Sequence, residues 1–428
     1  MHTLHRVSRQ RGAILITVSL VLLFMLGFMG FALDLNRMFV VRTELQTAMD
    51  SCALAAAQEL DGQPTSITRA ISAGTTAGNL NRVNMQSVNW DGQGQITSTS
   101  FAFMDGSYTP TTSPVTARYV ECSHIQPNVR LWLLQSMGAF MGRPDLYPGT
   151  GNLVARAVAK RGSAQTTCPI PVALRPKTPG APAPNFGYTP GEWITLLMAA
   201  GAGTNGYIGW ANLDGSNSAS ETERELSDGQ CATRVGDSLG TPGVQASVAD
   251  VWNARFGIYR NAGSPAVQRP DFSGYSYTTA NWPSGSGAYD GATPAGAHPT
   301  AANYVDKSAA FASCADTGTA MNGPNGCSSI IGRTIGGGFN TLVPPGAEAV
   351  GGHWQYGISR RIVLVPVTNG YPGTVDDYAC MLLLQPLSIP MTDIQLEFIG
   401  HAGVAGSPCT TNGLPGGTVG PLVPVLVR

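Results

Sequence analysis

Few residues in this chain combine a reactive side chain with a spacing that could do chemistry. Asp214, Ser216 and Ser218 form a DxSxS string, whose carboxylate and hydroxyl oxygens suit a hard divalent cation. The glycine and asparagine between them favour a flexible turn, and Gly209 and Asn212 weaken the strand that would hold Asp214 rigid. We therefore predict that these three residues do not form an obligatory metal site.

A glycine-rich string from Gly201 to Gly206 matches GxGxxG by letter. A dinucleotide site needs a strand before such a string and a helix after it, so that the helix N-terminus meets the pyrophosphate. Here the sequence predicts a helix over 193–200 and a strand over 207–213, which is the reverse order. We interpret the string as a helix-to-strand turn, and the glycines at 336–338 lack the lysine of a P-loop.

The remaining candidates are isolated residues. His353 and His401 each stand alone, and we interpret both as structural histidines rather than catalytic bases. No nucleophile elbow, HExxH or P-loop lysine motif lies in the strand and helix context that such motifs require. We therefore assign no catalytic, cofactor-binding or metal-binding residue, expect no cofactor, and expect that the protein is not an enzyme.

The cysteines suggest disulfides rather than zinc. A zinc site needs close Cys or His pairs, whereas the tightest cysteine spacing is the 13 residues from Cys314 to Cys327. An even number of cysteines in an exported chain favours oxidation, and the pairings we favour are Cys314 with Cys327 and Cys380 with Cys409. The eight cysteines are Cys52, Cys122, Cys168, Cys231, Cys314, Cys327, Cys380 and Cys409.

Composition excludes several classes of protein. Charged residues make up 12% of the 428 residues, about half of the usual ~25%, while glycine and proline are enriched at 53 and 30 residues. This argues against a coiled coil or a charged disordered tail. The formal net charge is −1, with only three lysines and no basic cluster, so a nucleic-acid partner is not expected.

One N-terminal segment is long and apolar enough to cross a membrane. Residues 13–33 contain no charge, and 21 residues at about 1.5 Å each cover the roughly 30 Å hydrocarbon layer. A cleaved signal peptide is the alternative, but its apolar region would be shorter and a small-residue cleavage site would follow closely. Arg6, Arg9 and Arg11 precede the segment, so residues 1–12 are predicted to form a cytoplasmic tail.

Beyond Leu33 the helix is predicted to continue as an amphipathic stalk. No proline or glycine occurs before Gly62, and apolar residues recur at steps of three or four. We expect this apolar stripe to pack on the following sheet or on a partner's helix. The stripe consists of Met38, Val41, Leu45, Met49, Cys52, Ala56 and Leu60. Pro64 begins a second helical pattern, which ends near Leu80.

The rest of the chain predicts an α+β fold in two parts. Residues 34–163 are expected to combine the stalk with a sheet of antiparallel strands, and residues 164–428 to form a β- and loop-rich second domain that carries disulfides. In the first part we predict strands over 83–90, 95–104, 115–123 and 152–160, and a helix over 128–140. In the second we predict a helix over 248–256, apolar runs over 361–367, 378–385 and 394–399, and a long surface excursion over 261–299.

Particular strings at both ends of the chain resemble one family. An RGA start, an uncharged span ending in Asp34-Leu35-Asn36-Arg37 and an alanine-rich run over 48–57 resemble the N-terminal segment of TadG-like Flp pilus-assembly proteins. VARAVA at 154–159 and the C-terminal GPLVPVLVR are also similar to this family. Cys52 replaces the family's usual alanine, and DxSxS only weakly matches the metal site of members with a von Willebrand A domain.

The resemblance implies a function that the residues alone do not reach. It implies a non-enzymatic, single-pass inner-membrane component of the Flp/Tad (tight adherence) pilus assembly system, minor-pilin-like or platform-stabilising, with a cytoplasmic N-terminus and most of the chain in the periplasm. The expected partners are other Tad/Flp assembly proteins in the inner membrane and periplasm, and membrane lipid. The alternative is a membrane-anchored periplasmic adhesin or hydrolase; a hydrolase would need a convergent Ser/His/Asp or acid–base set in its second domain.

Overall fold

The computed structural model describes residues 11–260, 268, 304 and 360–427, apart from gaps at 93, 141, 144, 146–148, 199–203, 243–245, 257–258, 372, 385, 388 and 412. These residues form two compact units. One unit ends at Arg161 and includes the chain from Pro424 onward, and the other is Gly162–Val423. The predicted α+β class, with a long apolar N-terminal helix, an antiparallel sheet and a β-rich disulfide-bearing part, is confirmed.

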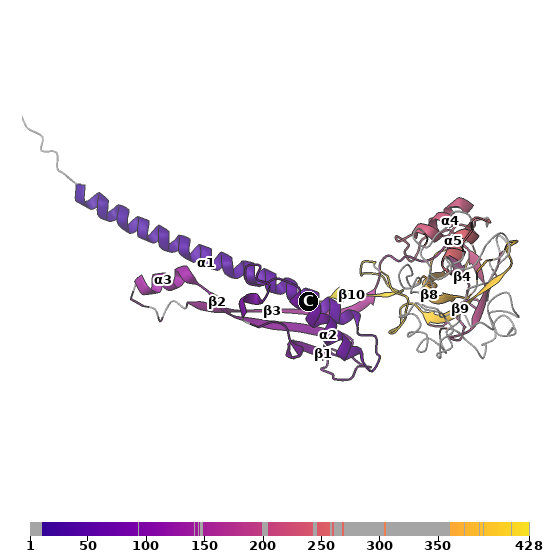
Figure 1. The fold of residues 1–428 in the computed structure, drawn as a ribbon, viewed down its shortest axis with the longest axis horizontal. Coiled ribbons are helices and arrows are strands. Elements are labelled where there is room, and N and C mark those ends of the chain that lie inside the picture. The colour runs from indigo at the N-terminus through magenta and orange to yellow at the C-terminus, as the bar shows by residue number, and fades with distance from the viewer. Residues whose placement is uncertain are drawn as a thin grey trace, which may run out of the picture. The chain divides into compact units, whose positions relative to one another are not determined.

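The first unit is built around one helix. α1 (Arg11–Gln58) is 48 residues long. Figure 1 shows it as one uninterrupted helix. The first proline of the chain is Pro64, and Gly62 adopts a φ of 81° in the turn after the helix, a conformation that glycine allows without steric cost. The second predicted helix follows as α2 (Ser66–Asn79). Arg69 of α2 donates to the Glu59 carboxylate at 2.9 Å, which ties the two helices together.

The sheet of this unit has four strands. β1 (Phe101–Met104), β2 (Tyr119–Arg130), β3 (Thr150–Ser163) and β10 (Leu422–Leu426) lie in the order β1-β2-β3-β10. β1 pairs with β2 and β2 with β3 in the antiparallel sense. The return of β10 places the residues from Pro424 onward in the first unit. The domain bounds expected from the sequence, 34–163 and 164–428, stay a prediction.

The apolar stripe of α1 packs on this sheet, one of the two predicted outcomes. Val41, Leu45, Met49, Cys52, Ala56 and Leu60 are buried, and Met38 is partly buried. Alanines at every second position of β3 face the helix in the same core, and their small side chains let it approach the sheet. Gln46 Nε2 adds a polar contact by donating to the carbonyl of Arg156 at 3.0 Å.

The predicted strand over 83–90 is wrong. Asn84, Met85 and Gln86 adopt positive φ values of 63°, 62° and 64°, which no strand contains. The carboxylate of Glu44 on α1 accepts the backbone N–H groups of Met85 and Gln86 at 2.9 and 3.2 Å. The apolar alternation of this segment therefore belongs to a loop that is held against the helix, with Trp90 buried in a short 3-10 turn (Trp90–Gly92).

Other strands and helices of this unit begin or end at residues different from those predicted. The strand expected over 95–104 is a 3-10 turn (Ser98–Ser100) followed by β1, and the strand expected over 115–123 begins at Tyr119 and continues to Arg130. β2 passes Pro127 through a register shift between Gln126 and Val129, so the helix expected over 128–140 begins later, as α3 (Trp132–Phe140). The strand expected over 152–160 is confirmed within β3.

The described residues of the second unit form a closed barrel and two helices. Its strands follow the order β4-β6-β5-β9-β8-β7. They are β4 (Val172–Leu174), β5 (Trp193–Leu196), β6 (Ile208–Trp210), β7 (Ile362–Val367), β8 (Asp377–Leu383) and β9 (Ile394–His401). The two helices are α4 (Ala219–Asp228) and α5 (Val248–Ala254). Trp210 of β6 meets Trp252 of α5 edge to face, with ring centroids 5.8 Å apart, so α5 packs into the main core.

Most of the elements predicted in this unit are confirmed, and one is wrong. The strand over 207–213, the helix over 248–256 and the three apolar runs correspond to β6, α5, β7, β8 and β9. The helix predicted over 193–200 is instead strand β5, because Trp193, Ile194 and Thr195 pair with β9 and their bulky or branched side chains suit a strand. α4 was not predicted, and the excursion over 261–299 lies outside the described residues, Gln268 excepted.

Candidate functional site

α1 consists of an exposed apolar part and a buried part. Within the described chain it is the one helix long and apolar enough to cross a membrane, as judged by length and composition. Its side chains from Ile14 to Leu33 are almost all exposed, including large ones such as Phe24 and Phe28. The side chains that face the sheet from Val41 onward are buried. The apolar part therefore fits a membrane anchor, and the buried part attaches that anchor to the sheet.

A disulfide strengthens this attachment. Cys52 of α1 is bonded to Cys122 of β2, and both residues are fully buried. On the other side of Cys52, a Cβ added to Gly78 would lie 3.1 Å from the Cys52 Cβ, so glycine lets α2 approach there. The pairing of Cys52 with Cys122 was not predicted from the sequence. The available signal was that Cys52 lies in the apolar stripe and Cys122 in a strand expected to face it.

Two further disulfides lie in the second unit. Cys380 is bonded to Cys409, which confirms the predicted pairing, and Cys168 is bonded to Cys231. The predicted oxidation of Cys231, Cys380 and Cys409 is thus confirmed. Cys314 and Cys327 lie outside the described residues.

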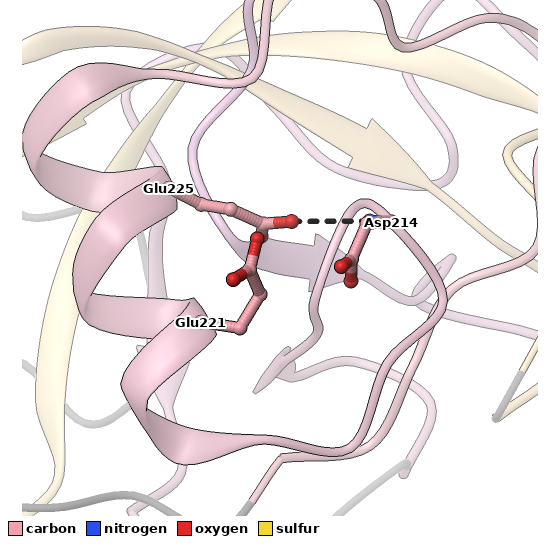
Figure 2. Close-up of side chains that lie close together, drawn as sticks. All are labelled: Asp214, Glu221 and Glu225. Atoms are coloured by element: carbon pink, nitrogen blue, oxygen red, sulfur yellow. Dashed lines mark hydrogen bonds between the residues drawn. The ribbon is translucent and has the colours of Figure 1, made fainter.

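Three carboxylates come together beside α4. One oxygen each of Asp214, Glu221 and Glu225 lies within 4.8 Å of the others, a group that could hold a metal ion (Figure 2). Asp214 comes from the loop after β6, and the two glutamates are four residues apart on one face of α4. Arg224 donates from Nε to the Glu221 carboxylate at 2.9 Å and supplies a positive charge to the cluster.

Glu225 is buried and already has hydrogen-bond partners. It accepts the backbone N–H groups of Leu213 at 3.0 and 2.9 Å and of Asp214 at 3.0 Å, the last drawn as a dashed line in Figure 2. Burial raises the pKa of Glu225 to about 7, although the hydrogen bonds from these two N–H groups act to lower it. The side chain therefore fastens the Asp214 loop to α4, which is a structural role that requires no ion.

The predicted DxSxS residues do not all join this cluster. Asp214 Oδ1 accepts the backbone N–H of Ser216 at 2.8 Å, as in an Asx-turn. Asn212 Nδ2 donates to Ser216 Oγ at 3.1 Å, and Ser218 stands at the N-cap of α4. Of the three DxSxS residues, only Asp214 lies among the carboxylates. Neither glutamate was predicted as a site residue, although their i, i+4 spacing after Ser218 is visible in the sequence. The absence of an obligatory metal site stays a prediction.

The other sequence candidates have structural surroundings. His401 Nε2 is 2.9 Å from Asp377 Oδ1, and His401 Nδ1 accepts the backbone N–H of Gly403 at 3.0 Å, so both ring nitrogens are satisfied as expected. The GxGxxG string follows strand β5 instead of the predicted helix, and strand β6, not a helix, comes after it. That order still lacks the helix of a dinucleotide site. His353 and the glycines at 336–338 lie outside the described residues.

The second unit contains a pocket of about 460 Å³. Its lining includes the bonded Cys168 and Cys231, and Arg255, whose guanidinium donates to the carbonyls of Arg360 at 2.7 Å and Leu226 at 2.9 Å. No histidine occurs among the described residues that line it. In the described part of its wall, the pocket therefore offers no nucleophile–histidine pair.

Comparison with protein families gives one match, and it lies in α1. Residues 12–59 match the family model described as "Putative Flp pilus-assembly TadE/G-like". Comparisons with curated proteins and with solved structures give no match. The matched residues cover nearly all of α1, both the exposed apolar part and the part that packs on the sheet. The chain therefore carries at its N-terminus a TadE/G-like segment of the kind found in Flp pilus assembly.

Proposed function

We propose that this protein is a non-enzymatic, inner-membrane-anchored component of the Flp/Tad pilus assembly system, minor-pilin-like or platform-stabilising. The observation that carries the proposal is the TadE/G-like segment at residues 12–59, which forms a single helix with an exposed apolar part and a part clamped to a sheet. Its partners are then other Tad/Flp assembly proteins in the inner membrane and periplasm, and membrane lipid, with no nucleic acid involved.

The proposed topology is single-pass, with the N-terminus in the cytoplasm and most of the chain in the periplasm. Three arginines precede the apolar segment, which favours a cytoplasmic tail under the positive-inside rule. The disulfides at Cys52–Cys122, Cys168–Cys231 and Cys380–Cys409 suit an oxidising compartment such as the periplasm. A reporter enzyme that is active only in the periplasm, fused after Arg428, should be active; activity of a cytoplasm-specific reporter there would refute this topology.

The division of α1 suggests how the protein acts in assembly. A helix of 48 residues extends over about 72 Å at 1.5 Å per residue, so it can cross the membrane and still have several turns outside it. Because the outer part is packed on and disulfide-bonded to the sheet, a force or displacement applied to the membrane span is transmitted directly to the sheet. A rigid rod of this kind can pack beside other apolar helices in the membrane while its sheet unit contacts the periplasmic machinery.

The experiment is a gene deletion, after which the wild-type gene or one of two variants is reintroduced. Deletion should abolish surface Flp fibres, seen by electron microscopy and by recovery of sheared pilin, and the wild-type gene should restore them. A variant whose residues 14–33 are replaced by an unrelated apolar span of equal length should remain in the membrane fraction but fail to restore fibres. The matched control exchanges only exposed residues of the second unit. Normal fibres in the deletion strain would refute the proposed function.

A further inference from the structure

A short apolar helix lies beside the end of the candidate membrane span. Figure 1 shows α3 alongside α1, at the far end of β2 and β3 from α2. A Cβ added to Gly27 would lie 3.2 Å from Met137 Sδ, and one added to Gly30 would lie 3.2 Å from Leu133 Cβ. α3 thus contacts the last turns of the uncharged segment, through positions where glycine leaves room.

Two charged residues of α1 fasten α3 in this place. Asp34 is only 7% exposed, and its Oδ2 accepts the backbone N–H of Leu134 at 2.6 Å, in the first turn of α3. An acidic group is favourable there because the first N–H groups of a helix lack partners within it. The Arg37 guanidinium lies over the Trp132 ring at 4.6 Å from its centroid. The Asp34-Leu35-Asn36-Arg37 string is therefore the attachment point of α3.

The exposed surface of α3 and of the adjacent turns of α1 is uncharged and carries several large apolar side chains. α3 has the sequence WLLQSMGAF and carries no charge; Trp132 is 58% exposed and Leu133 is 40% exposed. Large apolar side chains of α1 stay exposed beyond Leu33, at Leu35, Phe39 and Val40. Asp34 is buried and Arg37 is half-buried. The first exposed charged residue of α1 after Leu33 is therefore Arg42. The apolar surface of the span thus continues onto Trp132 and Leu133 of α3, and the other exposed side chains there, Asn36, Gln135 and Ser136, are polar but uncharged.

We propose that α3 is a second membrane-contacting element, an interfacial helix embedded in the leaflet from which the span emerges, with lipid as its partner. The proposal rests on the proposed membrane anchoring of α1. Gly27, which Met137 contacts, lies six residues before Leu33, which corresponds to about 9 Å along the helix. Interfacial helices bury their apolar face to about 5–10 Å in the boundary between headgroups and acyl chains.

The side chains of α3 suit this location. Tryptophan is enriched at the membrane–water interface, where its apolar ring and polar N–H are both accommodated. Arg37, stacked on that ring, has a long side chain whose charged end can extend toward the headgroups. The Asp34 carboxylate is buried and accepts the Leu134 N–H, so it adds no exposed charge to this surface. The base of the sheet, where β2 leads into α3, would then rest on the membrane surface.

The test measures the contact between Trp132 and lipid in the full-length protein. The chain is reconstituted into vesicles that contain phosphatidylcholine brominated on its acyl chains, which quenches only nearby tryptophans. Trp132→Phe keeps an apolar ring and removes the fluorophore. A matched control adds Val115→Trp to Trp132→Phe: Val115 is also 58% exposed, but it lies next to Pro114, whose carbonyl accepts from Ser66 Oγ at 3.2 Å. Ser66 follows the end of α1, and the 28 residue steps from Gly30 to Gln58 cover about 42 Å along the helix.

The expected result is that brominated lipid quenches a component of wild-type emission that is absent from Trp132→Phe. The Val115→Trp control should be insensitive to brominated lipid and quenched by aqueous iodide. Equal quenching of wild type and Trp132→Phe by brominated lipid would overturn the proposal. So would quenching of Trp132 by iodide, which would place α3 in water. Flotation of the vesicles reports anchoring separately, so a failure of α3 to contact lipid is distinguishable from a failure of the span to insert.

Discussion

The disulfide between Cys52 and Cys122 should account for a large part of the stability of the first unit. It closes a loop with a sequence separation of 70 residues, and the chain-entropy relation for a loop of this size gives about 4 kcal/mol at 25 °C. Both cysteines are fully buried, and alanine replaces each without adding a polar group to the core. We therefore expect Cys52→Ala/Cys122→Ala to keep the fold and to lower the free energy of unfolding of this unit by about that amount.

Hydrogen exchange followed by mass spectrometry can measure this loss within one unit of the full-length protein. A change of 4 kcal/mol corresponds to roughly a thousandfold faster exchange for amides that exchange only on unfolding of the unit, such as those in the buried part of α1 and in β2 and β3. Cys380→Ala/Cys409→Ala, with a separation of 29 residues, is the matched control and should accelerate exchange in the barrel strands β7 and β8. Unchanged exchange in α1 and β2 of the first variant, with a response in the control, would refute the assigned role of the Cys52–Cys122 bond.

Three further predictions concern single side chains. Leu45→Ala should lower the free energy of unfolding of the first unit by about 2–5 kcal/mol, because Leu45 is fully buried, whereas the exposed Thr47→Ala should change it by less than about 0.5 kcal/mol; similar effects in denaturant unfolding would contradict the packing. Millimolar Mg²⁺ or Ca²⁺ should not raise the Tm, and a rise of several degrees that disappears in Asp214→Ala would establish a cation site. Burial raises the pKa of Glu225 from its ordinary value near 4.5 to about 7, so the folded state binds this proton more tightly than the unfolded chain, and the stability due to Glu225 should fall as pH rises between these values. Glu225→Gln should lessen that fall in thermal unfolding across this pH range, and a Tm difference between the two proteins that does not vary with pH would contradict it.

The elements that the sequence predicted well are those whose patterns depend on local properties. α1 has an uncharged segment, no proline, and apolar residues at helical spacing, so its length and its buried stripe were both evident. In the strand over 152–160, Leu153 and three alanines occupy every second position, and this strand lies in β3 with those side chains in the core. In α1 and in β3, the local sequence alone determines which face is apolar. That face is buried whichever sheet or helix packs on it.

The elements that were missed depend on partners distant in the chain. Residues 83–90 alternate like a strand, but Glu44 on α1 captures two of their backbone N–H groups about 40 residues away in sequence. Trp193 to Leu196 fit a helical spacing, but β9, some 200 residues later, supplies the strand that pairs with them. Local propensity is a weak preference of a fraction of a kcal/mol per residue, so contacts of this kind override it.

The candidate sites also depend on contacts between residues distant in the chain, which the local sequence does not reveal. Asp214 was noticed because of its string, whereas Glu221 and Glu225 join it only because α4 folds back on the loop. Cys52 was noticed as an unusual residue in the stripe, but its partner Cys122 could be found only once the sheet was placed against α1. A sequence indicates which residues have the necessary chemistry, and the tertiary fold decides which of them meet.

Asp34 illustrates this distinction at the membrane boundary. In the sequence it is the first charge after the uncharged segment, so it marked the outer limit of the span at Leu33. In the structure its carboxylate is buried against the N-terminus of α3, where it accepts a backbone N–H from a residue 100 positions later in the chain. A charge that is hidden in this way does not end an apolar surface, and large apolar side chains remain exposed as far as Val40. The extent of the surface that lipid can cover therefore depends on the contact between α1 and α3, which the hydropathy of residues 13–33 alone cannot reveal.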